Sequence, residues 1–557
     1  MNHFKLILKL FIRNKLYVFV FITLIIFEIY INYFWLSEYI ATDDILGSIN
    51  GTLIFTAVSF IFAYFLCFEL SLTFTEIGVE ETIKSSKHMY MLTAAAAGIM
   101  AVSITYLIAL IYGFYVYHIS VLQADGLAFH IFSINTLYFF LIPSTGAILG
   151  TVSGTIFKRL KGYISLLIFL FLGTSLSDIL VIALFEGIGL DIYPIISIFK
   201  IIPQKLDYMN DFIYGIPVEL YKWFVCIFWI ALSIELYLLY ERIRFKSFKK
   251  MTLLFVPILL FTSYSSWDQG SILSFERNPK GMIYEVKTYF HQKEVLDEDG
   301  QFDITAYNMS AKIDKQLDME AMLEIDSAAP LEKYKFTLYS GYKIKSVKDE
   351  QGRNLKFSRH DDYFDVFPRE GKKISSITIR YKGSSPKFYS SRQGVLLLGY
   401  FPYYPMEGYR PVFLFTEEGR SFNTSIDVVP KEFDININSR IPIYSNMDSE
   451  TKGNPYHFSG IASTLTLIGG FIEEKTVGST HIYSFALYPH IELDLEEVSS
   501  ELGYFNKVFY LPNTVIFTGD FKESSVLLDD YFLSVAPNNA EFIINNIAGN
   551  RSGVQND

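Results

Sequence analysis

Residues 51–75 have the sequence GTLIFTAVSFIFAYFLCFELSLTFT, in which Glu69 is the one charged residue. An α-helix needs about 20 mainly apolar residues to cross the hydrocarbon core of a membrane, so this stretch is long enough to span it. Similar apolar segments recur through the first 266 residues, at 17–36, 51–75, 91–117, 132–156, 164–186, 221–240 and 251–266. We therefore expect an α-helical polytopic membrane domain of six spans, with the shorter segment 251–266 as a seventh span that leads outside.

The Lys and Arg residues of the short loops indicate the orientation, because cytoplasmic loops are enriched in both. Fourteen of them lie in the N-terminal stretch and in the loops after the second, fourth and sixth segments, whereas the opposite set holds only Lys200, Lys205 and Lys222. We expect a protein of the bacterial cell membrane with a cytoplasmic N-terminus and with residues 267–557 outside. If 251–266 lies in the membrane interface instead, the second half would be cytoplasmic. The basic run 242–250 just before it favours a true span.

Residues 1–16 combine apolar and basic side chains before the first span. Phe4, Leu6, Ile7, Leu10, Phe11 and Ile12 are mixed with Lys5, Lys9 and Arg13. This pattern predicts an amphipathic helix that lies in the inner membrane interface. A simple positive flank of the first span is the alternative.

The second half of the chain has a different character. Residues 1–266 hold 17 Lys and Arg and 17 Asp and Glu, and the remainder hold 30 and 41, so the whole net charge of −11 belongs to residues 267–557. An acidic excess argues against nucleic acid as a partner, because phosphates require a basic face. Apolar residues alternate at 307–313, 377–381, 433–437 and 483–487, which predicts a mostly-β extracellular domain. The aromatic cluster at 400–409 is more typical of its core than of a binding platform.

Several catalytic motifs are absent from the sequence. It contains no G-x-x-x-x-G-K-[ST] phosphate loop, no G-x-S-x-G nucleophile elbow and no H-E-x-x-H zinc motif. His481 and His490 are nine residues apart across a predicted strand, which does not suit a zinc site. We therefore expect no enzyme: no catalytic residue, no bound metal and no cofactor in this chain.

The loop after the second segment is polar and carries both charges, from Glu76 through Gly78, Glu80 and Glu81 to Lys84 and Lys87. Here the sequence resembles the permeases of type-2 ABC exporters, whose second span leads into an acidic E-x-x-G-T-x-E-x-L segment followed by a basic stretch. Glu76, Gly78, Glu81, Ile83, Ser85 and Lys87 match loosely, but Val79 and Glu80 replace the expected Gly-Thr. Residues 1–16 correspond to the family's elbow helix, and 187–219 to its extracellular hairpin within a permease domain of residues 17–250.

The resemblance implies partners as well as a fold. It implies a second permease protomer, most simply an identical one, and a cytoplasmic ABC ATPase that binds ATP and Mg. The coupling contacts with that ATPase would come from Glu76, Gly78, Glu80, Glu81, Lys84 and Lys87. A merely structural loop at 76–90 is the alternative.

Four carboxylates lie within or near the apolar segments: Glu28, Glu69, Asp178 and Glu235. A charge at the centre of a membrane costs at least about 2.5–3.5 kcal/mol, so each should be protonated, paired, or turned toward water or protein. They are candidates for the lining of a translocation path or for polar contacts between protomers. Interhelical hydrogen bonds, or snorkelling for Glu69 and Glu235, are the alternatives.

The sequence YKIKSVKDEQGRNLKF at 342–357, ITIRYKG at 377–383 and FYSSRQGVLLLGYFPYYP at 388–405 resemble the N-terminal β-domain of aminopeptidase-N-type zinc peptidases. The resemblance covers about residues 285–490 and lacks the catalytic G-x-M-E-N and H-E-x-x-H motifs. It implies a sheet domain without an active site, which either binds peptide at a strand edge or serves as a scaffold.

Together these features predict the membrane subunit of an ATP-driven ABC exporter for an amphipathic substrate such as a peptide or bacteriocin, in export or self-immunity. The alternative is a membrane-anchored extracellular module that binds or senses peptides without transport.

Overall fold

The computed structural model divides the chain into two compact units. Unit 1 comprises Met1–Leu206 and Ile216–Gln269, and unit 2 comprises Asp207–Gly215 and Gly270–Asp557. The structure describes residues 9, 11–42, 45–76, 87–119, 126–174, 176–190, 192–196, 199–202, 213–216, 218, 220–245, 256, 258–260, 296–369, 372–385, 388–416, 419–422, 429–449, 451, 453–462, 464–477, 480–485, 507–512, 524–528 and 531–535.

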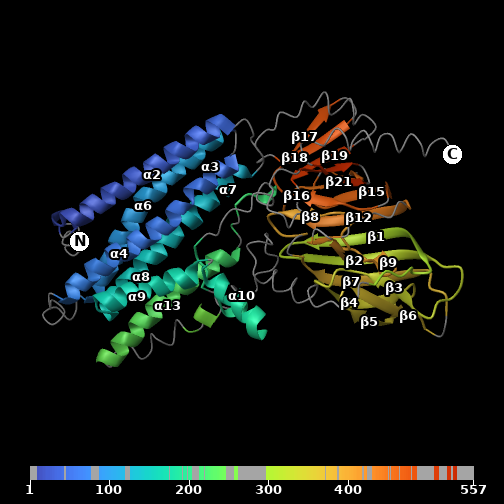
Figure 1. Ribbon diagram of the computed structural model, residues 1–557, viewed down its shortest axis with the longest axis horizontal. Coiled ribbons are helices and arrows are strands. Elements are labelled where there is room, and N and C mark those ends of the chain that lie inside the picture. Colours follow the sequence, from blue (N-terminus) through green and yellow to red (C-terminus); the bar gives the residue numbers. More distant parts are fainter. Residues whose placement is uncertain are drawn as a thin grey trace. The chain divides into compact units, whose positions relative to one another are not determined.

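Unit 1 is helical (Figure 1). Its helices are α2 (Lys15–Thr42), α3 (Ile45–Thr52), α4 (Ile54–Glu76), α6 (Lys87–Ile119), α7 (Leu127–Ile134), the π-helix η1 (Asn135–Leu141), α8 (Ile142–Ile156), α9 (Arg159–Gly173), α10 (Leu176–Ile188), α11 (Tyr193–Ile196) and α13 (Leu220–Phe245). Among the described residues, five stretches are long and apolar enough to cross a membrane: 17–38, 54–73, 91–119, 127–156 and 222–240. The pair α9–α10, bent by 63°, would add a sixth.

These helices lie where the apolar segments predict helices, with two differences in detail. The segment expected at 164–186 bends at Thr174, whose hydroxyl bonds the Leu170 carbonyl and accepts the Leu176 amide at 3.3 Å, so its side chain occupies backbone groups that a continuous helix would use. The segment expected to begin at 51 is interrupted at Leu53. The predicted seventh span, 251–266, lies largely outside the described residues. Within it, 256 and 258–260 are described, and they are helical. Most of the helix predicted at 1–16 also lies outside them.

Helices α4 and α8 pack through a row of glycines. A Cβ atom at Gly146, Gly150 or Gly154 would lie 2.7, 2.1 or 2.4 Å from the carbonyl oxygen of Phe60, Tyr64 or Phe68, respectively. Both sets repeat every four residues, so one face of α8 meets one face of α4 along two helical turns. Small residues at such positions let helix backbones approach closely in a membrane.

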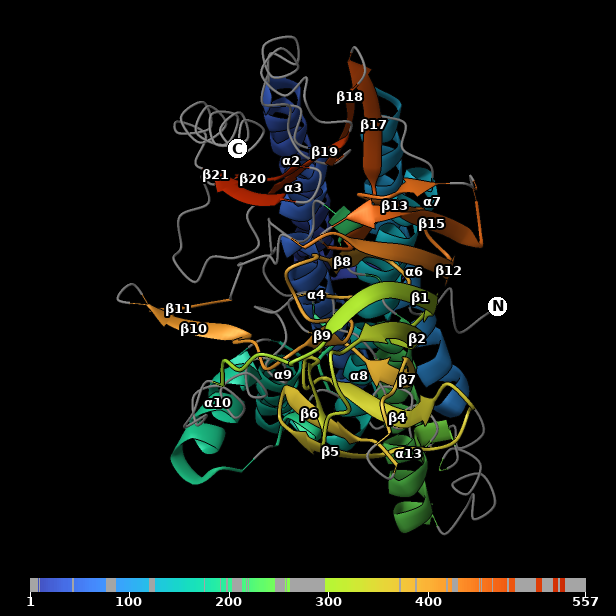
Figure 2. The same ribbon diagram turned by 90° about the vertical axis from the view of Figure 1, so that its right-hand side faces the viewer.

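Unit 2 is built from β-sheets (Figure 2). A seven-stranded sheet has the order β14-β15-β12-β1-β2-β7-β4, with β1 and β12 parallel and the other pairs antiparallel. Its strands are β1 (Asp303–Ile313), β2 (Leu317–Asp326), β4 (Tyr342–Asp349), β7 (Ser376–Gly383), β12 (Lys431–Ser439), β14 (Asp448–Ser449) and β15 (Tyr456–Ala462). The predicted alternation is confirmed in β1, where buried and exposed residues alternate from Met309 to Ile313.

The described part of the unit also contains four smaller sheets. They are β5-β6-β3-β9 from Lys356–His360, Tyr363–Phe367, Tyr334–Thr337 and Met406–Glu407; β13-β16-β8 from Ile443–Ser445, Leu467–Gly469 and Val395–Leu397; β10-β11 from Phe413–Thr416 and Gly419–Phe422; and β17 to β21 from Ile472–Val477, Thr480–Phe485, Lys507–Pro512, Ser524–Leu528 and Tyr531–Val535. The aromatic cluster at 400–409 is buried, as expected, with Tyr403 fully inaccessible.

A short segment that precedes α13 in the sequence forms part of the core of unit 2. Ile213 and Tyr214 are both fully buried, and the Phe471 amide donates to the Ile213 carbonyl at 2.7 Å. The Gln393 side chain donates to the Tyr214 carbonyl at 2.7 Å, and the Tyr214 ring meets the Tyr389 ring edge-on at 5.2 Å. Unit 2 therefore contains residues that the sequence places between two helices of unit 1.

Gly150→Ala should lower the free energy of unfolding by about 1–3 kcal/mol, because the new methyl group collides with the backbone of α4. The measurement is thermal unfolding in mild detergent. Gly187→Ala in α10 is the matched control, since a Cβ there meets no atom within 4 Å. Equal stability of the Gly150 variant and the wild type would contradict the glycine contact.

Gly470→Ala should displace Ile213, because the added Cβ would lie 2.1 Å from its carbonyl oxygen and Gly470 has φ +150°. We expect faster amide hydrogen exchange at residues 213–216 and a loss of about 1–3 kcal/mol. Gly453→Ala separates steric from backbone effects, since Gly453 has φ +139° but open space around its Cβ position. Unchanged exchange at 213–216 in the Gly470 variant would show that the segment does not depend on this contact.

Candidate functional site

A polar cluster joins the C-terminal end of α4 to the start of α9. Tyr163 donates to Glu69 at 2.6 Å, and the Arg159 guanidinium lies 3.9 Å from Glu69 and 3.4 Å from Glu76. The Glu69 side chain is 10% exposed, whereas those of Glu76 and Arg159 are more than half exposed. The Tyr163–Glu69 bond, which is partly buried, therefore contributes more to this junction than the solvated Arg159–Glu76 pair.

The structure thus brings together two of the predicted site residues, Glu69 and Glu76, through an arginine that the sequence did not single out. Helix α2 also reaches this end of α4, where Tyr17 packs against the cluster that contains Leu66 and Leu70. The segment 77–86 connects α4 to α6, and its predicted residues Gly78, Glu80, Glu81 and Lys84 lie outside the described residues. Lys87 is the first residue of α6.

The other intramembrane carboxylates have different surroundings. Asp178, in the first turn of α10, pairs with Lys200. Glu28 in α2 is 1% exposed and Glu235 in α13 is 7% exposed. Among the described residues, neither carboxylate oxygen of Glu28 has a hydrogen-bond partner, and the buried oxygen Oε2 of Glu235 has none either. The four residues therefore differ in kind: two take part in ion pairs and two carry unsatisfied oxygens.

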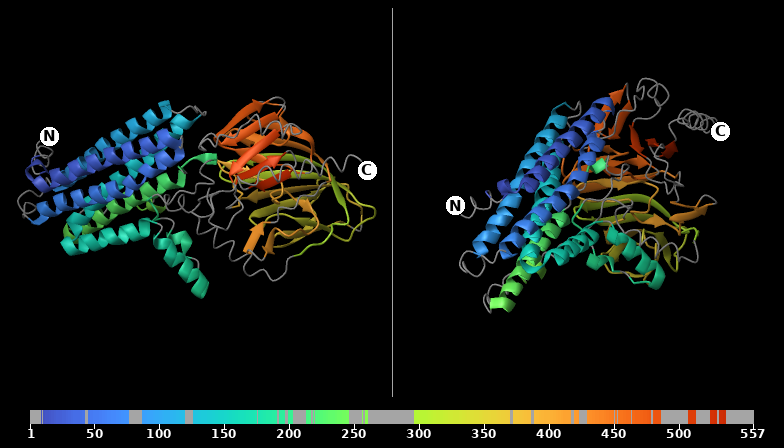
Figure 3. Two further views of the ribbon diagram at one scale, coloured as in Figure 1. Left: turned by 45° about the horizontal axis from the view of Figure 1, so that its top comes forward. Right: turned by 60° about the vertical axis from the view of Figure 1, so that its left-hand side comes forward.

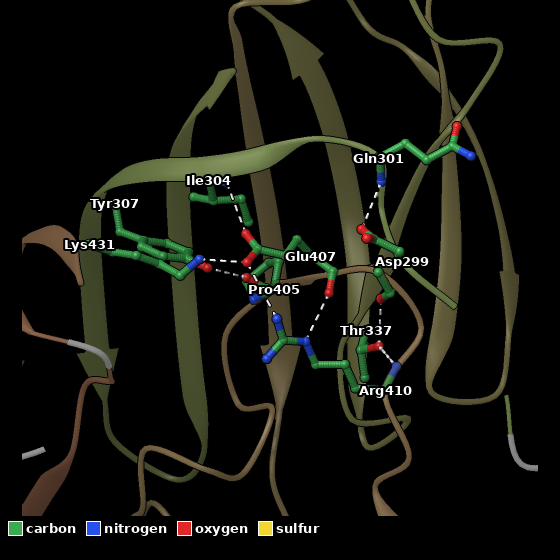
Figure 4. A network of polar contacts seen from close by, with 10 residues as sticks. Asp299, Gln301, Ile304, Tyr307, Thr337, Pro405, Glu407, Arg410 and Lys431 are labelled. Carbon is green, nitrogen blue, oxygen red and sulfur yellow. Dashed lines mark hydrogen bonds and ion pairs between the residues drawn. The ribbon is translucent and has the colours of Figure 1, made fainter. Parts of the chain in front are cut away.

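Unit 2 contains a polar cavity of about 720 Å³. Glu407 lies at its wall and accepts hydrogen bonds from Lys431 at 2.6 Å, from the Ile304 amide at 2.9 Å and from Arg410 at 3.3 Å (Figure 4). Thr337 donates to the Gly408 carbonyl and accepts the Arg410 amide, so it fixes the turn that carries Glu407. Four further carboxylates line the cavity: Asp297, Glu298, Asp299 and Asp303.

Tyr409 forms another part of the wall of this cavity. Its hydroxyl donates to Asp365, and Lys333 and Lys335 lie 5.8 and 5.6 Å from the centre of its ring. Burial raises the pKa of Tyr409, and the bond to the Asp365 carboxylate raises it further, so the phenol stays a neutral donor. The sequence alone does not reveal this cavity, because Glu407, Lys431 and Ile304 come from strands far apart in the chain.

The wall of this cavity presents charged and hydrogen-bonding side chains. Within the described residues, no three His, Cys, Asp or Glu side chains come together as metal ligands. The carboxylate of Glu407 is occupied by two cations and an amide, so its contacts are those of a structural anchor.

Glu407→Gln should destabilise unit 2 by about 3 kcal/mol, because it leaves the nearly buried Lys431 ammonium, 7% exposed, without its anion. The double variant Glu407→Gln/Lys431→Met should recover most of that loss, since the unpaired charge is gone. Chemical denaturation of the three proteins measures both steps. A double variant no more stable than Glu407→Gln would contradict the pairing.

No family model matches the chain, and no curated protein matches it. Solved structures of M1 zinc metallopeptidases from Deinococcus radiodurans, one of them bound to a Tyr-Ser-Ala substrate, are similar with 13% identity and a TM-score of 0.27, over 37% of this chain and 54% of theirs. Leukotriene A4 hydrolase from Saccharomyces cerevisiae is similar with 10% identity and a TM-score of 0.28, over 46% and 45%. The chain spans about half the length of these enzymes. The structural neighbours are thus of the M1 aminopeptidase type, at a similarity too low to carry an argument about activity.

Proposed function

We propose that the protein is the membrane subunit of an ATP-driven ABC exporter, with unit 2 outside the cell. The observation that carries the proposal is the cluster of Glu69, Tyr163, Arg159 and Glu76, which ties α4 to α9 directly beside the segment 77–86. A partner that pushes on this segment would move two spans together rather than one.

The mechanism needs a partner that binds and hydrolyses ATP, since the chain has no phosphate loop. ATP binding would draw two ATPase subunits together, and the segment 77–86 would transmit that movement to α4 and α9. ATP shifts the balance between inward-open and outward-open states only through its different affinity for the two. A second permease protomer completes the path, and the substrate class is amphipathic.

The cavity beside Glu407 favours a second candidate function. A polar cavity of about 720 Å³ is within the usual size of small-ligand sites. A membrane-anchored protein that binds or senses a ligand with unit 2, and transports nothing, would use it.

The full chain purified from its own membranes in mild detergent should carry a stoichiometric P-loop ATPase. Glu80→Lys/Glu81→Lys should reduce the recovered ATPase by about tenfold or more, because two anions facing the partner become cations. Glu320→Lys/Glu324→Lys on the exposed face of β2 is the matched control and should leave recovery unchanged. The measurement is quantitative mass spectrometry of the purified complex.

Absence of the ATPase from the wild-type preparation would remove the exporter proposal and leave the anchored module. Equal recovery with both double variants would exclude the acidic residues of the segment as the contact.

A further inference from the structure

The middle of α2 carries two polar side chains that lie inside unit 1. Glu28 is 1% exposed and Asn32 is 6% exposed. They are four residues apart and so share one face of the helix. The adjacent Phe27 and Ile29 are 38% and 52% exposed, which places the apolar face of α2 outward and the polar face inward.

Both polar groups are unsatisfied among the described residues. Neither carboxylate oxygen of Glu28 has a hydrogen-bond partner there, and the side-chain amide nitrogen of Asn32 has none either. This differs from Asp178, which is paired with Lys200, and from Glu69, which accepts a bond from Tyr163. A buried carboxylate without a partner is costly, so its presence points to a group that the described residues do not supply.

Helix α4 brings two more unsatisfied groups to the same level. Phe21 contacts Phe62 with ring centres 5.9 Å apart, and Phe27 contacts Phe55 at 6.1 Å. The two helices are therefore antiparallel neighbours (Figure 3), and the contact of Phe27 with Phe55 sets Glu28 within about one turn of Thr56.

The hydroxyl groups of Thr56 and Ser59 are buried, at 0% and 2% exposure, and have no partner in the described part of the chain. Thr56 and Ser59 are three residues apart and so lie on one side of α4. The level of Glu28 thus offers two carboxylate oxygens and two hydroxyl oxygens as acceptors. Leu24, one turn before Glu28, and Phe55, next to Thr56, are apolar and buried.

We propose that Glu28, Thr56 and Ser59 bind the ammonium group of an amphipathic organic cation. An ammonium has three N–H donors, which match one carboxylate and two hydroxyl acceptors, and its alkyl part suits the apolar surroundings. One carboxylate is too few for calcium, which takes six to eight oxygen ligands. That this ligand is an exported substrate rests on the proposed function. If both hold, the exported amphipathic substrates are cations.

The test uses the full chain in lipid nanodiscs, with n-decylammonium chloride as the probe and n-decanol as its uncharged match. Decylammonium should raise the unfolding temperature in a concentration-dependent way, because it binds the folded state. Glu28→Gln should weaken decylammonium binding about tenfold or more in calorimetric titration, while the response to decanol stays the same.

Glu235→Gln is the matched control, because it neutralises another buried carboxylate with an unsatisfied oxygen, and it should retain the wild-type affinity. Glu28→Gln keeps the shape of the side chain and removes an unpaired acid, so the free variant should unfold no earlier than the wild type. Thr56→Val should weaken decylammonium binding by a smaller factor than Glu28→Gln.

Equal affinity of wild type and Glu28→Gln, or equal responses to amine and alcohol, would overturn the site. A rise in unfolding temperature with sodium chloride in place of the amine would overturn the organic ligand. This test is independent of the ATPase pull-down. Amine binding without a co-purified ATPase would support the Glu28 site and contradict the exporter proposal. A co-purified ATPase without amine binding would contradict the site alone.

Discussion

Helices α4 and α8 approach so closely that the backbone of one occupies the space where a side chain of the other would stand. Gly146, Gly150 and Gly154 make this contact possible, and the rest of unit 1 is arranged around it. The same α4 face continues to Phe68, against which Gly162 of α9 packs, and the Tyr64 hydroxyl donates to the Gly162 carbonyl at 3.0 Å. The position of α9, and with it that of Arg159 and Tyr163, thus follows from the glycine contact.

Unit 1 treats its polar side chains in two ways. At the end of α4 each side chain of the Glu69 cluster has a hydrogen-bond or ion-pair partner, which makes a firm junction next to the segment 77–86. At the level of Glu28 the acceptors are left without donors, among the described residues. A junction that transmits force is stiffer when all its polar groups are hydrogen-bonded, whereas a ligand-binding site needs acceptors without a partner in the free protein.

Much of the fold follows from local patterns in the sequence. Apolar runs of about 20 residues predict the long helices, and alternation predicts strands such as β1, β7 and β12, because each signal depends on neighbours in the chain. The burial of the aromatic cluster at 400–409 also follows from composition. The bend at Thr174 does not, since it depends on how one hydroxyl divides its hydrogen bonds.

The sites are harder to predict, because their residues meet across long sequence separations. The cost of burying charge selected Glu28, Glu69, Asp178 and Glu235, but nothing in the sequence separates the paired from the unpaired members. Arg159 lies 83 residues from Glu76, and Ile304 lies 103 residues from Glu407. Only the tertiary structure brings such partners together.

The position of Ile213 and Tyr214 in the core of unit 2 determines how this protein can be dissected. A fragment that starts at residue 270 would contain every β-strand that the structure describes and would still lack the fully buried Ile213 and Tyr214. The rings and glycines that enclose them, Tyr389, Gly394 and Gly470, would line an apolar vacancy open to water. Unit 2 is thus continuous in space but not in sequence. A fragment with its complete core must include the segment 207–215, which the ribosome makes before any of the strands.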